Sequence, residues 1–370
     1  MKKHLVLAGG GHAHMMTLAN LHRFVEKGYR VTVVQPSPYH YYSGMGPGML
    51  GETYSPEEIR FATRHVVEKQ GGTFVLGKVD QIDPKDGKVH LESGETLTYD
   101  VISFNIGSYV PRKHGDNTDG DIFTVKPIEK LLSAQKRILE LVPQRKITIG
   151  IIGGGPSAVE IAGNTWQLAR KSAGHPPVIR IYTRSTLMPN HPGGVRRKIV
   201  ASLSTRGISI AENSDVQQIA PGQIKLATGE VHAVDIIFVA VGVQPSAVFK
   251  TSELPTGPDG GLEVNQYLQC TAHPEMFGGG DCIYFKDHPL DKVGVYAVRQ
   301  NPILLHNLLA FMDDTPLQPF APGGDYLLIF NLGGGTGVLR KKWLLLGGRL
   351  AFVIKDLIDR RFMRKFQAIE

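Results

Sequence analysis

Cysteine is scarce in this sequence. Its 370 residues include two cysteines, Cys270 and Cys282. They form no C-x-x-C pair and no zinc-binding pattern, and they are too few for a disulfide framework. The sequence therefore excludes a disulfide-stapled fold and suits a reducing compartment.

Long hydrophobic runs are also missing. No segment approaches the roughly 18 apolar residues that span a bilayer. The apolar run near the start, residues 4–8, stops at three glycines and is too short for a signal peptide. We therefore expect a cytoplasmic protein, and the C-terminal segment leaves open a peripheral position on the inner face of the membrane.

Acidic residues are outnumbered by basic ones. The chain has 41 Lys and Arg against 34 Asp and Glu, a net charge of +7, so a negatively charged partner or surface is expected. The basic residues are not interleaved with aromatic ones, so nucleic acid is not an expected partner. The 14 histidines show no ligand spacing, so no metal site is expected.

Glycine, by contrast, is abundant, and its 43 residues gather at turns. The first cluster follows the apolar strand 4–8 and precedes a helical pattern, which predicts a strand–turn–helix unit. Gly9 allows the tight turn, and Gly11 lets the backbone approach a diphosphate at the helix N-terminus. The candidate cofactor contacts here are Gly9, Gly10, Gly11, His12, Ala13 and His14. We expect the two histidines to be structural rather than proton donors.

A second copy of this unit lies at residues 145–162, where a strand enters Gly153-Gly154-Gly155 and a helix follows. Its candidate cofactor contacts are Gly153, Gly155, Pro156 and Ser157. Neither unit has the Asp or Glu that usually ends the following strand: Gln35 stands in the first and Tyr182 in the second. Arg184, just beyond Tyr182, favours a ribose phosphate, so NADPH is expected at least as much as NADH, unless this basic stretch is only a solvated surface.

Two more strands repeat one pattern, at residues 99–107 and 234–245. Each is a buried-type strand that ends in a candidate cofactor-binding glycine, Gly107 or Gly242. A later strand leads into Gly280-Asp281, which places a carboxylate beside glycines. The sequence thus predicts an α/β fold with two Rossmann-like dinucleotide-binding domains. After the second strand of the first unit, residues 36–51 predict a loop that includes Pro47 and either lies against a flat ring system or covers the surface.

These pieces together resemble the pyridine nucleotide-disulfide oxidoreductase superfamily. The resemblance implies that the first glycine turn and Asp281 bind FAD, that the second turn faces NAD(P)H, and that the FAD domain is interrupted by the NAD(P) domain. The implied domains are an FAD domain at 1–115 and 255–322, an NAD(P)H domain at 122–250 and a small α+β C-terminal piece at 323–370.

Within the superfamily, Tyr39-His-Tyr-Tyr, Pro47-Gly-Met-Leu-Gly and Ser55-Pro-Glu-Glu resemble the type II NADH dehydrogenase and sulfide:quinone reductase branch. The chain looks closest to members found alone or linked to selenide, water dikinase. Because no cysteine precedes Cys270, the dithiol chemistry of disulfide reductases is excluded, and the cysteines do not match the set of sulfide:quinone reductases. Quinone-reducing members carry a Gln where Val295 stands here, although Gln300 matches a later Gln of that motif.

The resemblance implies an FAD-dependent oxidoreductase that passes a hydride from NAD(P)H to the flavin and on to an acceptor. Glu160 and Lys292 are the predicted catalytic residues, one near the nicotinamide and one beside the flavin. Val295 and Tyr296 lie at the start of a helix whose positive end would face the flavin. The acceptor stays open: a quinone, or a component of selenium or sulfur metabolism. A flavin-binding regulatory protein with a vestigial NAD(P) site is a further alternative.

The C-terminal piece predicts a two-stranded hairpin at 326–346 and an amphipathic helix from Arg349. Its apolar positions include Leu350, Val353 and Leu357, and its basic residues, with Lys355 among them, are expected on the other side. Two interpretations stay open: the helix packs on the fold, or it anchors the protein to an anionic membrane. We expect a monomer or a homodimer.

Overall fold

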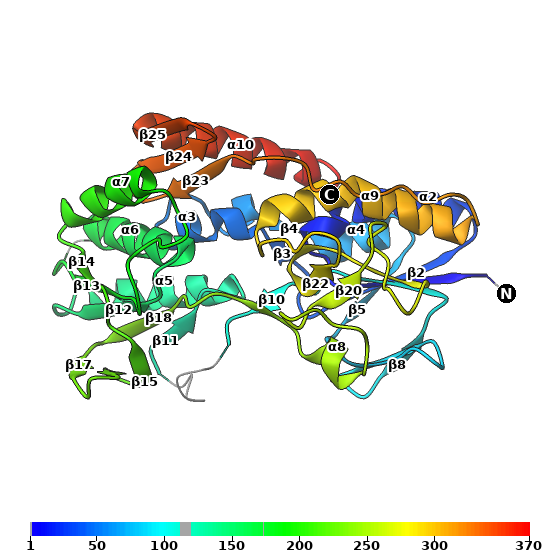
Figure 1. Cartoon of the computed structure of the whole chain (residues 1–370), viewed down its shortest axis with the longest axis horizontal. Coiled ribbons are helices and arrows are strands. Elements are labelled where there is room, and N and C mark those ends of the chain that lie inside the picture. Colours follow the sequence, from blue (N-terminus) through cyan, green and yellow to red (C-terminus); the bar gives the residue numbers. More distant parts are fainter. Residues whose placement is uncertain (1, 112–119, 173) are drawn as a thin grey trace.

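Two five-stranded parallel sheets form the framework of the computed structural model, which describes residues 2–111, 120–172 and 174–370 (Figure 1). The first has the order β21-β9-β1-β2-β5 and the second the order β11-β18-β12-β13-β14. In the first sheet the strands are β1 (His4–Ala8), β2 (Arg30–Gln35), β5 (Thr73–Leu76), β9 (Val101–Phe104) and β21 (Met276–Gly278). In the second they are β11 (Ile122–Thr124), β12 (Thr148–Ile152), β13 (Val178–Tyr182), β14 (Ser209–Ala211) and β18 (Ile236–Val239).

The two sheets are built on the same plan. In each, the strand that enters a glycine turn lies between the closing strand of the unit and the next strand in sequence. Gly9 and Gly153 both have positive φ, +87° and +136°. A Cβ at either position would lie within 2.3 Å of a carbonyl oxygen on the neighbouring segment, so only glycine fits. The predicted α/β class with two Rossmann-like units is confirmed.

The helices cover these sheets, and the remaining strands form small ribbons. The helices are α1 (Met15–Leu18), α2 (His22–Glu26), α3 (Gly46–Leu50), α4 (Thr63–Lys69), α5 (Glu129–Leu141), α6 (Pro156–Lys171), α7 (Gly193–Ser204), α8 (Val248–Thr251), α9 (Gly294–Met312) and α10 (Arg349–Gln367). The ribbons are β6 (Val79–Asp83) with β7 (Lys88–Leu91) and β8 (Thr96–Thr98), β15 (Val216–Ala220) with β16 (Gln223–Leu226) and β17 (Val231–Ala233), β20 (Leu262–Val264) with β22 (Ile283–Phe285), β3 (His40–Tyr41) with β4 (Arg60–Phe61), and β10 (Ser108–Tyr109) with β19 (Gln244–Pro245).

The chain returns to the first sheet after completing the second. β21 pairs in parallel with β9, and α9 packs on the first turn of the chain and on α1. The first unit is therefore interrupted by the second, as the resemblance implied. The residue boundaries of the domains stay predictions, and residue 115 lies outside the described residues.

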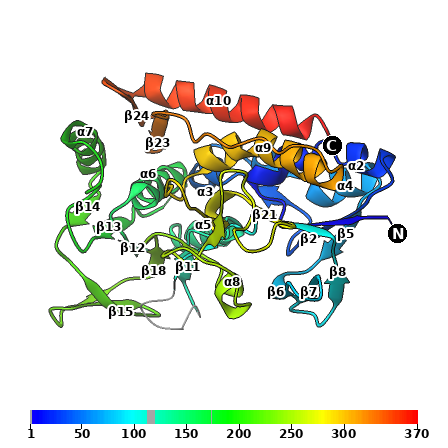
Figure 2. The ribbon, with the colours of Figure 1, turned by 45° about the vertical axis from the view of Figure 1, so that its right-hand side comes forward.

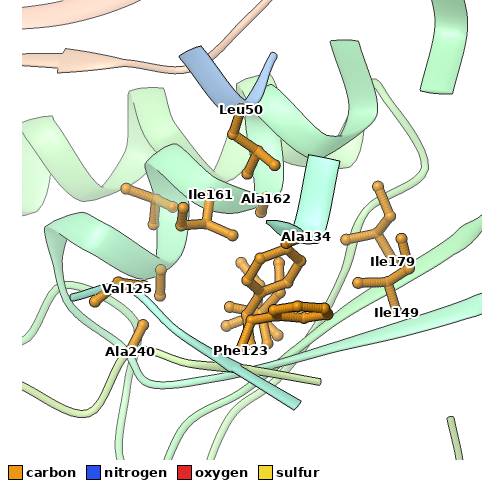
Figure 3. Close-up of a cluster of buried hydrophobic side chains, with 14 of the residues drawn as sticks. Leu50, Phe123, Val125, Ala134, Ile149, Ile161, Ala162, Ile179 and Ala240 are labelled. Carbon is orange, nitrogen blue, oxygen red and sulfur yellow. The ribbon is translucent and has the colours of Figure 1, made fainter. Parts of the chain in front are cut away.

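Each sheet has its own hydrophobic core. Figure 3 shows part of the second core, where Ile149 and Ile179 of the sheet lie beneath Ile161 and Ala162 of α6. Leu50, although it comes from the N-terminal third of the chain, is also buried here. The expectation of a loop over residues 36–51 is therefore wrong for its second half: α3 forms there, and all five of its residues are buried.

The C-terminal piece differs from the predicted hairpin. It is a three-stranded antiparallel sheet of β23 (Leu328–Asn331), β24 (Gly337–Lys341) and β25 (Leu344–Gly348), followed by α10. Figures 1 and 2 show α10 lying along one edge of the molecule, with its C-terminal end near α4.

Candidate functional site

A cavity of about 740 Å³ is lined by residues from both units. Its volume lies in the upper part of the range that ligand pockets occupy. The predicted site residues that line it are Gly9, Gly10, Gly11, His12, Gln35, Pro47, Gly107, Ser157, Glu160, Gly280, Asp281 and Lys292. The structure thus brings together residues that are up to 283 positions apart in the chain (from Gly9 to Lys292).

The remaining predicted residues lie elsewhere. Ala13 and His14 are buried beneath the first turn, and Val295 is absent from the cavity wall, where Val293, Gly294 and Ala297 of the same segment take its place. Tyr296 borders a separate small hollow. Gly153, Gly155 and Pro156 at the second glycine turn do not line the cavity, and neither do Arg184 and Gly242, which follow β13 and β18.

His14 holds the first glycine turn in place. Its Nδ1 lies 2.7 Å from the Gly9 carbonyl oxygen and its Nε2 lies 2.7 Å from Ser103 Oγ on β9. Burial lowers the pKa of His14 to about 4, so the ring is neutral and can donate to one partner while it accepts from the other. This residue therefore links the turn to the neighbouring strand.

Gln35 presents an unpaired acceptor beside the turn. Its Nε2 donates to the carbonyl oxygens of Ser37 and Tyr39, at 2.7 and 2.8 Å. These two bonds fix the orientation of the amide, because only the nitrogen can donate. The oxygen, Oε1, is buried and has no hydrogen-bond partner among the described residues. A ligand hydroxyl in the cavity would supply the missing donor.

Asp281 is tied to a lysine that sequence reasoning missed. Lys126 Nζ lies 2.7 Å from Asp281 Oδ2, and Ser108 Oγ donates to the same oxygen at 2.8 Å. Burial would raise the pKa of Asp281, but Lys126 and Ser108 outweigh it and hold that pKa below its usual value. Both partners line the cavity, so this wall combines a carboxylate, a hydroxyl and an ammonium group. No signal in a single sequence points to Lys126.

Lys292 lies in the wall beside Asp281 and is also paired. Its Nζ lies 2.7 Å from Asp259 Oδ2 and donates to the carbonyl oxygen of Ile283. These contacts fix its position next to the N-terminus of α9, which begins at Gly294. The ammonium group and the helix dipole thus add positive potential to the same part of the cavity.

Glu160 is the carboxylate on the α6 side of the cavity. Its Oε1 accepts a hydrogen bond of 2.7 Å from the backbone N–H of Asn331. Burial raises the pKa of Glu160 to about 7, although the charge of Lys355 opposes that rise, and Asp359 adds to it. A carboxyl group with this pKa exchanges its proton at neutral pH.

The two residues that tune Glu160 come from α10, and their placement corrects the sequence analysis. Lys355, expected on an outward basic side, is buried, and its Nζ donates to Asp359 Oδ2 at 2.6 Å and to the Gly44 carbonyl at 2.8 Å. The hydroxyl of Tyr42 donates to the other oxygen of Asp359 at 3.1 Å. The spacing of four residues puts Lys355 and Asp359 on one face of the helix, but nothing in the sequence says that this face is the inner one.

A cluster of aromatic rings connects the first glycine turn to α10. The ring of His12 lies 4.8 Å from the ring of His40 and 5.1 Å from that of Tyr42, centroid to centroid. Phe362 of α10 packs 4.9 Å from Tyr42. Burial lowers the pKa of His12 to about 4, so this histidine is uncharged at neutral pH. Neither cysteine belongs to the cavity wall.

Comparisons with known proteins agree on one family. The family model described as pyridine nucleotide-disulphide oxidoreductase matches residues 3–305. The demethylphylloquinone reductase NdbB of Synechocystis sp. is 25% identical over 379 aligned residues, covering 96% of this chain and 90% of that protein.

Two solved structures share the fold over the whole chain. The sulfide:quinone oxidoreductase of Aquifex aeolicus has a TM-score of 0.80 at 19% identity, with coverage of 100% of this chain and 92% of that one. NDH2 of Plasmodium falciparum, solved in complex with NADH, has a TM-score of 0.80 at 14% identity, with coverage of 100% and 97%. The chain belongs to the pyridine nucleotide-disulphide oxidoreductase family, which confirms the predicted class of FAD-dependent NAD(P)H oxidoreductase.

Proposed function

We propose that this oxidoreductase holds FAD in the cavity, takes electrons from NAD(P)H and delivers them to a quinone at a membrane surface. The observation that carries the proposal is the cavity itself. It joins the first glycine turn to Glu160, a carboxyl group whose pKa of about 7 suits proton transfer at neutral pH.

The residues of the cavity fit FAD. Gln35 Oε1 is a buried acceptor without a partner in the described chain, as an adenosine ribose hydroxyl would require. A Cβ at Gly11 would lie 1.7 Å from Asn105 Oδ1, so no side chain fits there. A diphosphate can therefore approach the backbone of Gly11 closely. In this proposal Asp281 orients the ribitol of FAD, which links the diphosphate to the flavin ring.

Bound FAD supplies the two-electron chemistry between a nicotinamide and an acceptor. Lys292 and the N-terminus of α9 would stabilise negative charge that develops on the ring. Glu160 would supply a proton from solvent. Reduction of a quinone to a quinol takes two electrons and two protons; the hydride of NAD(P)H provides both electrons and one proton, and the second proton would come through Glu160.

The outer face of α10 supports a membrane surface as the place of reaction. Leu350, Val353 and Leu357 are 59%, 48% and 64% exposed, and Trp343 at the tip of the C-terminal sheet is 89% exposed. Around them lie the exposed basic residues Lys341, Lys342, Arg349, Arg361, Arg364 and Lys365. An apolar face with a basic rim fits the headgroup region of an anionic bilayer.

Two further observations fit this surface. In the described residues, no helix has the length and hydropathy needed to cross a bilayer, so attachment would be peripheral. NdbB is named as a reductase of a quinone, demethylphylloquinone, which supports a quinone as the acceptor here. We infer that the protein works on the inner face of the membrane, as a monomer or a homodimer.

The test is a two-step measurement with the FAD-loaded protein. Anaerobic mixing with NADPH or NADH should bleach the flavin absorption band, and a short-chain quinone should then restore it. Omission of the quinone is the control for the second step. If neither coenzyme bleaches the band, the enzyme proposal fails; if the band bleaches but no quinone in a panel restores it, the acceptor is of another class.

A further inference from the structure

The duplication of the two sheets identifies the residue that faces the adenosine ribose in the second unit. In the first unit, a Cβ on Gly10 would lie 2.2 Å from the side-chain oxygen of Gln35. In the second, a Cβ on Gly154 would lie 2.2 Å from the side-chain oxygen of Thr183. Thr183 is therefore the counterpart of Gln35.

The strand register gives the same answer. Ala8, before the first glycine turn, pairs with Val34, and Ile152, before the second, pairs with Tyr182. Tyr182 is thus the counterpart of Val34, the residue before Gln35. Its assignment to the ribose position in the sequence analysis is therefore wrong. Tyr182 is instead fully buried in the second core.

The same correspondence places the next two residues. In the first unit, Pro36 and Ser37 follow Gln35 and line the cavity. Their counterparts in the second unit are Arg184 and Ser185, both exposed. A guanidinium group and a hydroxyl thus follow the ribose position.

No free carboxylate opposes them from the neighbouring strand. Glu212 follows β14, whose Ala211 pairs with Tyr182, so it is the acidic residue in register with this end of β13. It accepts 2.7 Å hydrogen bonds from the Leu187 N–H and from Arg196 Nη2, and these bonds lower the pKa of Glu212. Arg196 therefore neutralises it. In the described part of the chain, the ion pairs of this unit involve other basic residues and leave Arg184 unpaired.

We propose that the second unit selects NADPH over NADH because Arg184, with Ser185, binds the 2′-phosphate of the adenosine ribose. A carboxylate at the Thr183 position would accept hydrogen bonds from the ribose diol of NADH and repel that phosphate, but Thr183 is neutral. A guanidinium group matches phosphate geometry with paired N–H donors. This inference rests on the proposed function in so far as it assumes that NAD(P)H binds at the second glycine turn.

The primary test measures binding rather than turnover. Calorimetric titration of the FAD-loaded protein with 2′,5′-ADP and with 5′-ADP should show the 2′-phosphorylated ligand binding about 10- to 100-fold more tightly, as expected for hydrogen bonds to a charged group. Arg184→Ala should abolish most of that difference and leave 5′-ADP binding nearly unchanged. Arg184→Asp should reverse the preference.

The matched control is Lys146→Ala. Lys146 is exposed and precedes β12, at the opposite end of the sheet, so its loss removes the same charge without touching the ribose position. Equal affinity of the unaltered protein for both ligands, or a preference that survives Arg184→Ala, would overturn the inference. A preference for 2′,5′-ADP without flavin bleaching by either coenzyme would leave this inference standing and refute the proposed function.

Discussion

Glu160 is the residue on which we expect proton transfer in this site to depend. Burial raises its pKa to about 7, and the nearby pair from α10 acts on it in two directions. The positive charge of Lys355 favours the carboxylate and lowers the pKa, whereas the negative charge of Asp359 disfavours it and raises the pKa. Burial thus has the largest effect on the pKa of Glu160, and the buried ion pair adjusts it.

The first prediction concerns pH. Below pH 7 Glu160 is protonated and can donate, and above pH 7 it is ionised and cannot, so quinone reduction should slow as pH rises through about 7. Glu160→Gln should remove this transition and lower the rate at low pH by about 10²–10⁴-fold, the usual contribution of an acid catalyst. Steady-state rates across pH 5.5 to 9, as roughly the range where such a group titrates, provide the measurement.

Two further variants sharpen this prediction. Lys355→Met should move the transition to higher pH and Asp359→Asn should move it to lower pH, because they remove charges of opposite sign. Glu95→Gln, at an exposed position of the first unit, is the control and should leave the profile unchanged. A transition that survives in Glu160→Gln would assign the proton to another group.

At the scale of elements, α10 departs from the usual pattern of a helix packed on a soluble fold, which buries its apolar residues and exposes its charged ones. Its inner face carries the charged pair Lys355 and Asp359, 7% and 4% exposed, among apolar residues. Its outer face exposes the large apolar side chains of Leu350, Val353 and Leu357. The inner face of the helix therefore places Lys355 and Asp359 near Glu160, and its outer face forms the surface that we assign to the membrane.

The second prediction tests that outer face. Leu350→Ser combined with Leu357→Ser should lower binding to vesicles of anionic phospholipid at least about tenfold, because two exposed apolar side chains no longer enter the bilayer. Co-flotation with vesicles measures it. The binding that remains should weaken with added salt, since the basic rim acts by electrostatic attraction.

The control for this prediction must keep the inner face of α10 intact. Removal of the whole helix would also remove Lys355 and Asp359, so point variants are preferable to truncation. Leu76→Ser combined with Val231→Ser removes two apolar side chains that are 57% and 55% exposed and far in sequence from α10. If both double variants bind vesicles equally well, the outer face of α10 is not the contact.

At the scale of the whole molecule, the cavity is where separate parts of the chain meet. The first sheet contributes the glycine turn and Gln35, the second unit contributes Ser157 and Glu160, and the returning segment contributes Asp281. A ligand in this cavity contacts both units together. Its binding should therefore stabilise the fold as a whole rather than one sheet.

The third prediction follows from that arrangement. FAD at about 1,000 times its dissociation constant should add about 4 kcal/mol to the free energy of unfolding, and removal of FAD should lower the melting temperature. Gly11→Ala should lose most of the stabilisation by FAD. The new Cβ would lie 1.7 Å from Asn105 Oδ1 and displace groups of the cavity wall at the first glycine turn. Differential scanning calorimetry with and without FAD measures both effects.

Gly324→Ala is the matched control, since a Cβ there would meet nothing within 4 Å. It should melt like the unaltered protein and gain the same stability from FAD. A melting temperature that does not respond to FAD in the unaltered protein would contradict the assignment of the cavity.

The sequence by itself determined the two glycine turns, the strands that enter them, the carboxylate at Asp281 and the family. These features depend on residues that are close in the chain, such as Gly9 to Gly11 after an apolar strand, and local patterns of this kind specify local structure.

Only the tertiary structure decided which distant groups meet. It brought Lys126 to Asp281, set Thr183 rather than Tyr182 beside the second turn, and placed Lys355 behind Glu160. Helical periodicity showed that α10 has two different faces, but it could not show which one turns inward. The orientation of α10 depends on the buried carboxyl group of Glu160, whose charge interacts with Lys355. Glu160 lies almost 200 residues before Lys355 in the chain, so no local pattern links them.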